Sequence, residues 1–196
     1  MVRMRPGPDA PAVMRNYSLC GPPEAPTYRI AVKNERGLTS GFLHQSVRAG
    51  SRLEISAPRG SFVLAAGKTP VVLIRAGVGV TPILAMLHGA TATDAVASRP
   101  IWWLHSARDR AHHSFAKEAD GLLAALRASH RCVIYSRPAP ADLLGQDFDR
   151  SGHLSRELLQ GIGIPQNSDF YLCGPPGFLQ DLQSGLAAWG VPWVRS

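Results

Sequence analysis

The spacing of apolar residues changes near residue 70. From Pro70 onward, short apolar runs alternate with longer helical segments, and this alternation predicts a parallel sheet covered by helices. Ligands of such sheets bind at the carboxyl ends of the strands. We expect strands over residues 71–76, 100–105, 131–136 and 169–173, and helices over residues 81–90, 113–129, 155–161 and 177–189.

The first third of the chain has shorter apolar runs, separated by Gly and Pro. They predict small antiparallel strands over residues 13–19, 28–32, 52–57 and 62–64. Between them, Ser40 is expected to cap a short helix that turns Phe42 and Leu43 inward. A polar turn at residues 66–70 separates the two patterns, which predicts two domains, 1–67 and 68–196.

The sequence Gly77-Val78-Gly79-Val80-Thr81-Pro82 joins a buried strand to a helix. Glycine has no Cβ, so the backbone of such a turn can come close to a ligand and point amide N–H groups at a phosphate. A nucleotide cradle is one interpretation of this turn. A purely structural tight turn is the other.

Composition narrows the classes of function. The chain has 196 residues and a formal charge of +7, but its 21 Lys and Arg residues are scattered, so we do not expect nucleic acid as a partner. The spacing of Cys20, Cys132 and Cys173 excludes a disulfide framework and an iron–sulfur pattern, and suits a reducing cytoplasm. Without a long apolar stretch or a secretory leader pattern, we expect neither export nor membrane insertion.

The segment Arg15-Asn16-Tyr17-Ser18 places a cation, a flat ring and a hydroxyl on one extended piece of chain. In a strand, Arg15 and Tyr17 share one face while Ser18 turns to the other. An ordinary exposed strand is the alternative interpretation of so short a sequence.

Four motifs together resemble the ferredoxin–NADP reductase superfamily, and especially the reductase modules of flavohaemoglobins. They are Arg15-x-Tyr17-Ser18, Gly37-x-x-Ser40-x-x-Leu43-His44, Gly77-x-Gly79-x-Thr81-Pro82 and Cys173-Gly174-Pro175-Pro176. The resemblance implies an antiparallel flavin-binding barrel followed by a Rossmann-like parallel-sheet NAD(P)-binding domain. Because Arg15 lies so near Met1 and the chain ends near Trp193, we expect a partial barrel and a module truncated at both ends.

The resemblance also implies a flavin site in the first domain, for FAD or, alternatively, FMN. Arg15 would neutralise the flavin phosphate, since its planar fork donates two hydrogen bonds at once. Tyr17 would pack on the flavin and Ser18 would lie near its reactive N5. Residues 37–40, with Gly37, Thr39 and Ser40, would bind the remaining phosphate charge.

A nicotinamide nucleotide site is implied in the second domain, for NADH or NADPH. Gly77, Gly79 and Thr81 would cradle the nucleotide, with Thr81 capping the helix and Pro82 at its first position. Ser106 and Arg108 follow a strand where the fold usually contacts the adenosine ribose, and could bind a 2′-phosphate.

Cys173, Gly174 and Pro175 would close the transfer site above the flavin. The resemblance thus assigns hydride transfer to a site framed by Ser18, Thr81 and Cys173, with Cys173 as a wall and not a nucleophile. His105, His112 and His113 invite a metal hypothesis, which we disfavour because no carboxylate or thiolate completes a ligand set.

The expected function is NAD(P)H oxidation by a flavin-dependent oxidoreductase that passes electrons to a separate acceptor, a haem, an iron–sulfur centre or a small molecule. The alternative is a non-catalytic nucleotide-binding or interaction fragment that cannot hold flavin. A Rossmann-type dehydrogenase without flavin is disfavoured, because the glycine motif differs from G-x-G-x-x-G.

Overall fold

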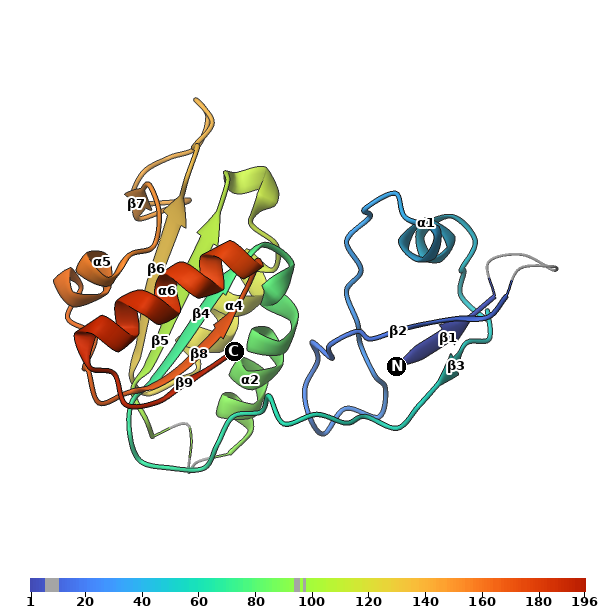
Figure 1. Ribbon diagram of the computed structural model, residues 1–196, viewed down its shortest axis with the longest axis horizontal. Coiled ribbons are helices and arrows are strands. Elements are labelled where there is room, and N and C mark those ends of the chain that lie inside the picture. The colour runs from blue at the N-terminus through green and yellow to red at the C-terminus, as the bar shows by residue number, and fades with distance from the viewer. Residues whose placement is uncertain (6–10, 94–95, 97) are drawn as a thin grey trace.

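The computed structural model describes residues 1–5, 11–93, 96 and 98–196, which form two sheets (Figure 1). A small antiparallel sheet has the order β2-β1-β3, and a six-stranded sheet has the order β7-β6-β5-β4-β8-β9. The strands of the six-stranded sheet are β4 (Val71–Ala76), β5 (Ile101–Ala107), β6 (Ser129–Tyr135), β7 (Arg150–Ser151), β8 (Asp169–Cys173) and β9 (Val194–Arg195).

All neighbouring strands of the larger sheet run parallel. The predicted fold class, a small antiparallel part followed by a Rossmann-like parallel sheet, is confirmed. The predicted bounds of β4 and β8 match the structure residue for residue, while β5 and β6 shift by one or two residues. The short edge strands β7 and β9 were not predicted.

Helices cover both faces of this sheet. They are α2 (Val80–Ala92), α4 (Ala116–Ala124), α5 (Arg156–Gly161) and α6 (Pro176–Trp189). Val71 and Leu73 of β4 pack with α2 and α4, whereas Val72 and Ile74 face α5 and α6. This alternation follows from the two-residue period of a strand, and it explains why β4 is apolar on both faces.

The predicted starts of α5 and α6 are each one residue from those in the structure, and the starts of α2 and α4 also differ. The helix expected to begin at Thr81 begins at Val80. Its N-cap is Gly79, which has no side chain to cap it, so Thr81 is not the cap and Pro82 is the third residue of the helix. The helix expected over 113–129 is only α4, because Phe115 is left-handed (φ 60°) just before it. Its expected last residue, Ser129, already pairs with Ile101 in the sheet.

The small sheet contains β1 (Val2–Met4), β2 (Val13–Arg15) and β3 (Glu54–Ile55). β1 was not predicted. The strand expected over residues 28–32 is wrong, since only Ile30 forms a bridge, with Leu19, and residues 62–64 form no strand. These apolar side chains pack on the larger region instead of pairing with each other: Phe62 and Leu64 contact the core beneath α2 and α4.

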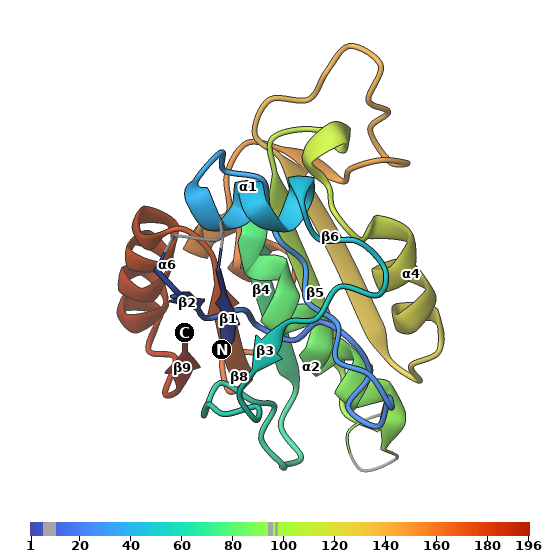
Figure 2. The ribbon, with the colours of Figure 1, turned by 90° about the vertical axis from the view of Figure 1, so that its right-hand side faces the viewer.

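The short helix α1 (Leu38–Gln45) lies beside the small sheet (Figure 2). Gly37 is its N-cap, so the prediction that Ser40 caps it is wrong: the Ser40 hydroxyl donates to the Gly37 carbonyl from inside the first turn. No helix among the described residues is long and apolar enough to cross a membrane.

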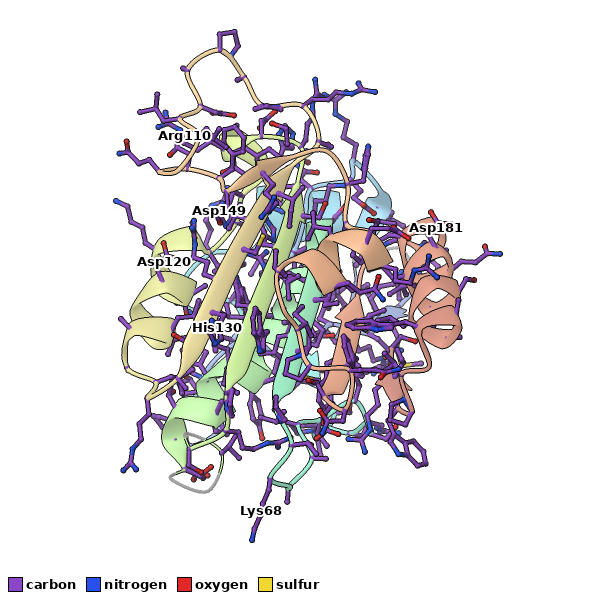
Figure 3. All side chains as sticks on the ribbon, turned by 90° about the vertical axis from the view of Figure 1, so that its left-hand side faces the viewer. Lys68, Arg110, Asp120, His130, Asp149 and Asp181 are labelled. Carbon is purple, nitrogen blue, oxygen red and sulfur yellow. The ribbon has the colours of Figure 1, made fainter. Side chains whose placement is uncertain are left out.

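A buried arginine holds the segment of residues 65–69, which links the small sheet to the six-stranded sheet. Arg99 donates to the carbonyls of Ala65 (2.9 Å) and Thr69 (2.6 Å) and forms an ion pair with Asp169. Lys68 of this link lies at the end of the sheet opposite Arg110, as Figure 3 shows. The link is therefore fixed to the amino ends of the strands, far from the edge where ligands are expected.

Candidate functional site

Two glycine turns meet at the carboxyl edge of the six-stranded sheet. β4 ends at Ala76 and β8 ends at Cys173, and the strands are adjacent, with Arg75 paired to Cys173. A Cβ on Gly79 would overlap the Cys173 carbonyl and lie 2.7 Å from the Gly174 nitrogen. Only glycine allows this approach, so the two motifs at Gly77 and Cys173 form one structural unit.

This unit carries two helix N-termini. Gly77 has φ +55° and open space where a side chain would stand, while α2 and α6 both begin here without a side-chain cap. The first N–H groups of a helix lack intrahelical acceptors, and the helix dipole favours negative charge at that end. The turn is therefore suited to the diphosphate of a nucleotide.

Thr81 and Cys173 flank the unit. Thr81 is buried and Cys173 is half-buried. Burial raises the pKa of the Cys173 thiol, which keeps the thiol protonated at neutral pH. A protonated thiol is a poor nucleophile, so Cys173 is suited to be a wall of the site.

The carboxyl ends of β5 and β6 extend the same edge. Ser106 is half-buried and Arg108 is exposed, with its Nε 3.6 Å from Asp109. The backbone N–H of Arg137 donates to the Arg108 carbonyl at 2.8 Å. This bond holds two guanidinium-bearing loops side by side beyond the glycine turns.

The flavin residues implied by the resemblance lie on β2 and the chain after it. Arg15 is exposed, and among the described residues its guanidinium donates only to its neighbour's carbonyl, Met14 (2.9 Å). Tyr17 is half-buried; burial raises the pKa of its hydroxyl, although the charge of Arg15 opposes this. An uncommitted guanidinium, a flat ring and the exposed hydroxyl of Ser18 fit a flavin phosphate and ring.

The α1 motif offers fewer free groups. Gly37 is exposed, but the Ser40 hydroxyl is used within the helix, and the Thr39 hydroxyl is buried without a hydrogen-bond partner among the described residues. His44 Nε2 lies 2.8 Å from the Val32 carbonyl, which is a structural contact. The backbone at Gly37 is thus the part of this motif that a phosphate could reach.

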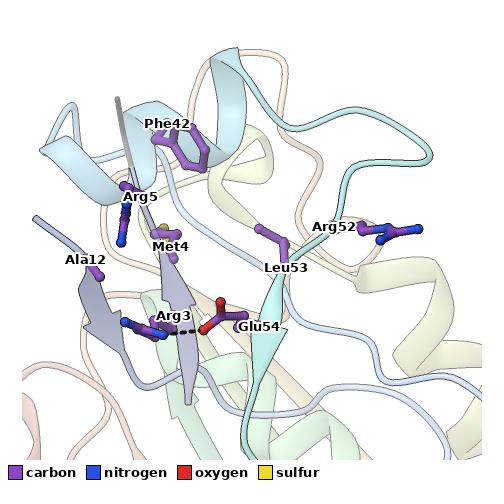
Figure 4. Close-up of a pocket in the computed structure, with 8 residues that line it drawn as sticks. All are labelled: Arg3, Met4, Arg5, Ala12, Phe42, Arg52, Leu53 and Glu54. Atoms are coloured by element: carbon purple, nitrogen blue, oxygen red, sulfur yellow. Dashed lines mark hydrogen bonds and ion pairs between the residues drawn. The ribbon is translucent and has the colours of Figure 1, made fainter. Parts of the chain in front are cut away.

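A cavity of about 260 Å³ lies beside α1 and the small sheet (Figure 4). Its lining includes Met4, Phe42 and the ion pair between Arg3 and Glu54. Phe42 lies between Ser40 and Leu43 of the second motif, but none of the residues named in the four motifs lines this cavity.

Sequence reasoning missed a buried polar group behind the glycine turn. Arg75 is fully buried over the Trp103 ring and donates to the Ser114 carbonyl (3.0 Å), but its Nε and Nη1 have no partner among the described residues. Next to it, His105 stacks on His113 at 4.2 Å. The sequence did offer a sign of this buried polar group, because an arginine stands inside the apolar run 71–76.

These histidines are neutral at physiological pH. Burial and the charge of Arg75 lower the pKa of His113 to about 4 and hold that of His105 far below its ordinary value. Within the described residues, no three His, Cys, Asp or Glu side chains are grouped to hold a metal ion.

The architecture and the paired glycine turns define a nucleotide-binding module of an oxidoreductase. The family described as the oxidoreductase NAD-binding domain matches residues 73–184. The chain belongs to this family, and with it to the ferredoxin–NADP reductase superfamily that its motifs resemble.

Individual relatives agree with this. A flavohemoprotein of Deinococcus radiodurans is 38% identical over 93% of this chain. The match covers 45% of that relative, so the chain spans about half the length of the curated proteins it matches.

Solved structures are similar over almost the whole chain. The flavohem-like FAD/NAD-binding domain of nitric oxide dioxygenase from Vibrio cholerae has a TM-score of 0.84 and 32% identity, covering 97% of this chain and 78% of that one. A flavohemoglobin of Malassezia yamatoensis, solved with bound FAD and heme, has a TM-score of 0.79 and 26% identity, covering 99% of this chain and 49% of that one.

Proposed function

We propose that this chain is a flavin-dependent reductase module that oxidises NAD(P)H. The observation that carries the proposal is the contact between the Gly79 and Cys173 turns at two uncapped helix N-termini. This contact would form a site for a dinucleotide diphosphate, in a chain that also carries the Arg15-Tyr17-Ser18 segment. A bound flavin accepts a hydride and releases single electrons, chemistry that no amino-acid side chain supplies.

The chain's own residues would position the reactants. Arg15 would bind the flavin phosphate, Tyr17 would pack against the flavin, and Ser18 would donate a hydrogen bond near its reactive edge. Gly37, Thr39 and Ser40 would contribute chiefly backbone N–H groups, because the Ser40 hydroxyl is already engaged.

On the nucleotide side, Gly77, Gly79, Thr81 and Pro82 would form the cradle for the diphosphate. Cys173, Gly174 and Pro175 would exclude water from the transfer site without crowding it, because the turn has little side-chain bulk. We place the domain boundary after Gly67, in the link that Arg99 holds.

The nucleotide preference would be decided at Ser106 and Arg108. A guanidinium beside a hydroxyl suits the 2′-phosphate of NADPH. Asp109, 3.6 Å from Arg108, competes for the same charge. Replacing Arg108 with Ala therefore tests the preference: it should raise the KM for NADPH more than the KM for NADH if Arg108 binds the phosphate.

The electron acceptor would be a separate centre. Relatives are named flavohemoproteins, which favours a haem over an iron–sulfur centre or a small molecule. The three free thiols fit a reducing compartment such as the cytoplasm.

The first experiment is the visible spectrum of the purified protein before and after anaerobic addition of NADH and then NADPH. Flavin bands that bleach on addition would establish the reductase and its preferred donor. The Arg15→Ala variant should lose flavin affinity by about tenfold or more, since hydrogen bonds to charged groups contribute about 1.5 to 3 kcal/mol. Arg59→Ala, an exposed arginine outside all four motifs, is the matched control.

A second candidate is a nucleotide-binding module without turnover. The exposed apolar side chains of the small sheet, Met14 and Ile55, favour it, because they show how little of the first region is buried. A protein that stays colourless after incubation with FAD and FMN but still binds NADH would establish this candidate and exclude the reductase.

A further inference from the structure

One arginine of the first region reaches two helices of the second. Arg29 forms a forked ion pair with Glu118 of α4: Nη2 lies 2.6 Å from Oε1 and Nη1 lies 3.3 Å from Oε2. A planar guanidinium that meets both carboxylate oxygens fixes orientation as well as distance. Arg29 also lies over the Phe115 ring at 5.9 Å, at the start of the same helix.

The same guanidinium holds the chain next to the flavin segment. Arg29 Nη2 donates to the carbonyl of Cys20, and the backbone N–H of Cys20 donates back to the Arg29 carbonyl at 2.9 Å. The Cys20 side chain is fully buried in the core formed with α2 and α4. Ser18 is only two residues away, so the end of the Arg15-Tyr17-Ser18 segment is tied to the nucleotide region at this point.

The carboxylate partner is held from a second helix. His88 of α2 places Nε2 2.7 Å from Glu118 Oε1, and its side chain is 12% exposed. Although burial raises the pKa of Glu118, the hydrogen bonds from Arg29 and His88 outweigh this and leave it below the ordinary value. Glu118 is therefore ionised at neutral pH, and His88 holds it as well as Arg29.

Stability alone does not account for this arrangement. The side chains of Arg29 and Glu118 are 42% and 28% exposed, and ion pairs that exposed contribute little to stability. The position of the reacting groups is more sensitive to such a contact, because the rate of hydride transfer falls steeply when the reacting atoms move by as little as 1 Å.

We propose that Arg29, oriented by Glu118 and His88, is a positioning residue that sets the flavin segment against the nucleotide cradle. The proposal rests on the proposed function, since it assigns to these residues the alignment of hydride donor and acceptor.

The test compares four variants with the wild type. Arg29→Met and Glu118→Gln each remove the ion pair, and Arg29→Lys keeps the charge but loses the fork. Asp120→Asn is the matched control: Asp120 also lies on α4, and its pair with Arg131 (3.0 Å) stays within the nucleotide region. If Arg29→Met does not fold, Glu118→Gln tests the same contact.

Two measurements apply. In flavin-loaded protein, the rate of flavin reduction at saturating NADH should fall about 10- to 100-fold in Arg29→Met and Glu118→Gln. It should recover partly in Arg29→Lys and stay unchanged in Asp120→Asn, with the Kd for NADH the same in all four. In flavin-free protein, exchange of the Cys20 amide hydrogen should quicken severalfold in the first two variants only.

The outcomes separate the two proposals. A wild type that reduces flavin, with Arg29→Met and Glu118→Gln as fast as wild type, overturns the positioning role and leaves the reductase intact. A wild type that takes up no flavin overturns the proposed function instead. In that case, an unchanged exchange rate of the Cys20 amide hydrogen in both variants would also overturn the inference that Arg29 and Glu118 hold this part of the chain. Faster exchange would support that inference.

Discussion

The two regions of the chain, residues 68–196 and residues 1–67, are each stabilised in a different way. In the later region every residue of β4 is buried between two layers of helices. In the earlier region the strands have two or three residues, and Met14 and Ile55 are 57% and 56% exposed. A sheet buried on both faces is stabilised by its own core, whereas this small sheet and its one short helix bury little apolar surface of their own.

The first region is ordered in part by contacts with the second. Cys20, Phe62 and Leu64 pack against the core of the nucleotide region, and Arg29 and Arg99 add polar attachments. The Arg15-Tyr17-Ser18 segment therefore takes its position from contacts with the nucleotide region as well as from its own sheet. Perturbations of the two regions should differ accordingly.

The largest effect is expected at Gly79. In Gly79→Ala the new Cβ would overlap the Cys173 carbonyl, so the two turns must separate, at a cost of about 4 kcal/mol or more in the free energy of unfolding. NADH binding should be lost with it. Urea unfolding followed by circular dichroism and calorimetric titration with NADH measure both effects.

Gly89→Ala on the same helix is the control for Gly79. No atom lies within 4 Å of the position its Cβ would take, so this variant should gain about 0.5 to 1 kcal/mol. Equal stability of the two variants would show that the turns are not in contact.

The next effect contrasts the two regions directly. Leu73→Ala, in the buried centre of β4, should lower the free energy of unfolding by about 2 to 5 kcal/mol. Met14→Ala on β2 should change it by no more than about 0.5 kcal/mol, because the side chain is largely exposed. A large loss in Met14→Ala would mean that the small sheet buries more surface than its exposure indicates.

The same contrast explains what could be predicted from sequence. The bounds of β4 and β8 followed from apolar runs, because their environment is apolar on both faces and the local pattern is complete. The strand expected over 28–32 failed because Ile30 forms only an isolated bridge with Leu19, and its neighbour Ala31 packs on the core of the other region, which local spacing does not encode.

The candidate site shows the same division. The glycine motifs were recognisable because a positive φ at Gly77 favours glycine, and because the Cys173 carbonyl approaches Gly79 too closely for any side chain. The role of Arg29 could not be predicted from its neighbours in the sequence, since its partner carboxylate, Glu118, lies 89 positions further along the chain. The roles of the motif residues in cofactor binding remain predictions for the experiments above.

A smaller effect of opposite sign is expected at Arg75. Burial lowers the pKa of this guanidinium to about 9, and two of its nitrogens have no partner among the described residues. Arg75→Met removes a buried charge at the cost of one hydrogen bond to the Ser114 carbonyl and of the contact between the cation and the Trp103 ring, so we expect a net gain of about 1 kcal/mol. A loss of stability in urea unfolding would contradict the view that this cation is costly.

The last effect is a dependence of stability on pH that arises in the nucleotide region. Burial and the charge of Arg75 lower the pKa of His113 to about 4 from 6.5, so between these values the unfolded chain binds more protons than the folded one. Stability should therefore fall as the pH is lowered from 6.5 towards 4, and His113→Gln should flatten that slope.

Exchange of amide hydrogens at the two values of pH locates this effect. The amides of β5 and β6, which flank His113 through His105 and Tyr135, should lose protection at the lower pH. The strands β1 and β2 belong to the other region and contain no histidine. Their amides should therefore lose protection only as far as the contacts of Arg29 and Cys20 couple the first region to the second. If the amides of β1 and β2 lose protection first, the first region opens independently of the second. Its order would then depend on the contacts of Arg29 and Cys20 more than on the stability of the six-stranded sheet.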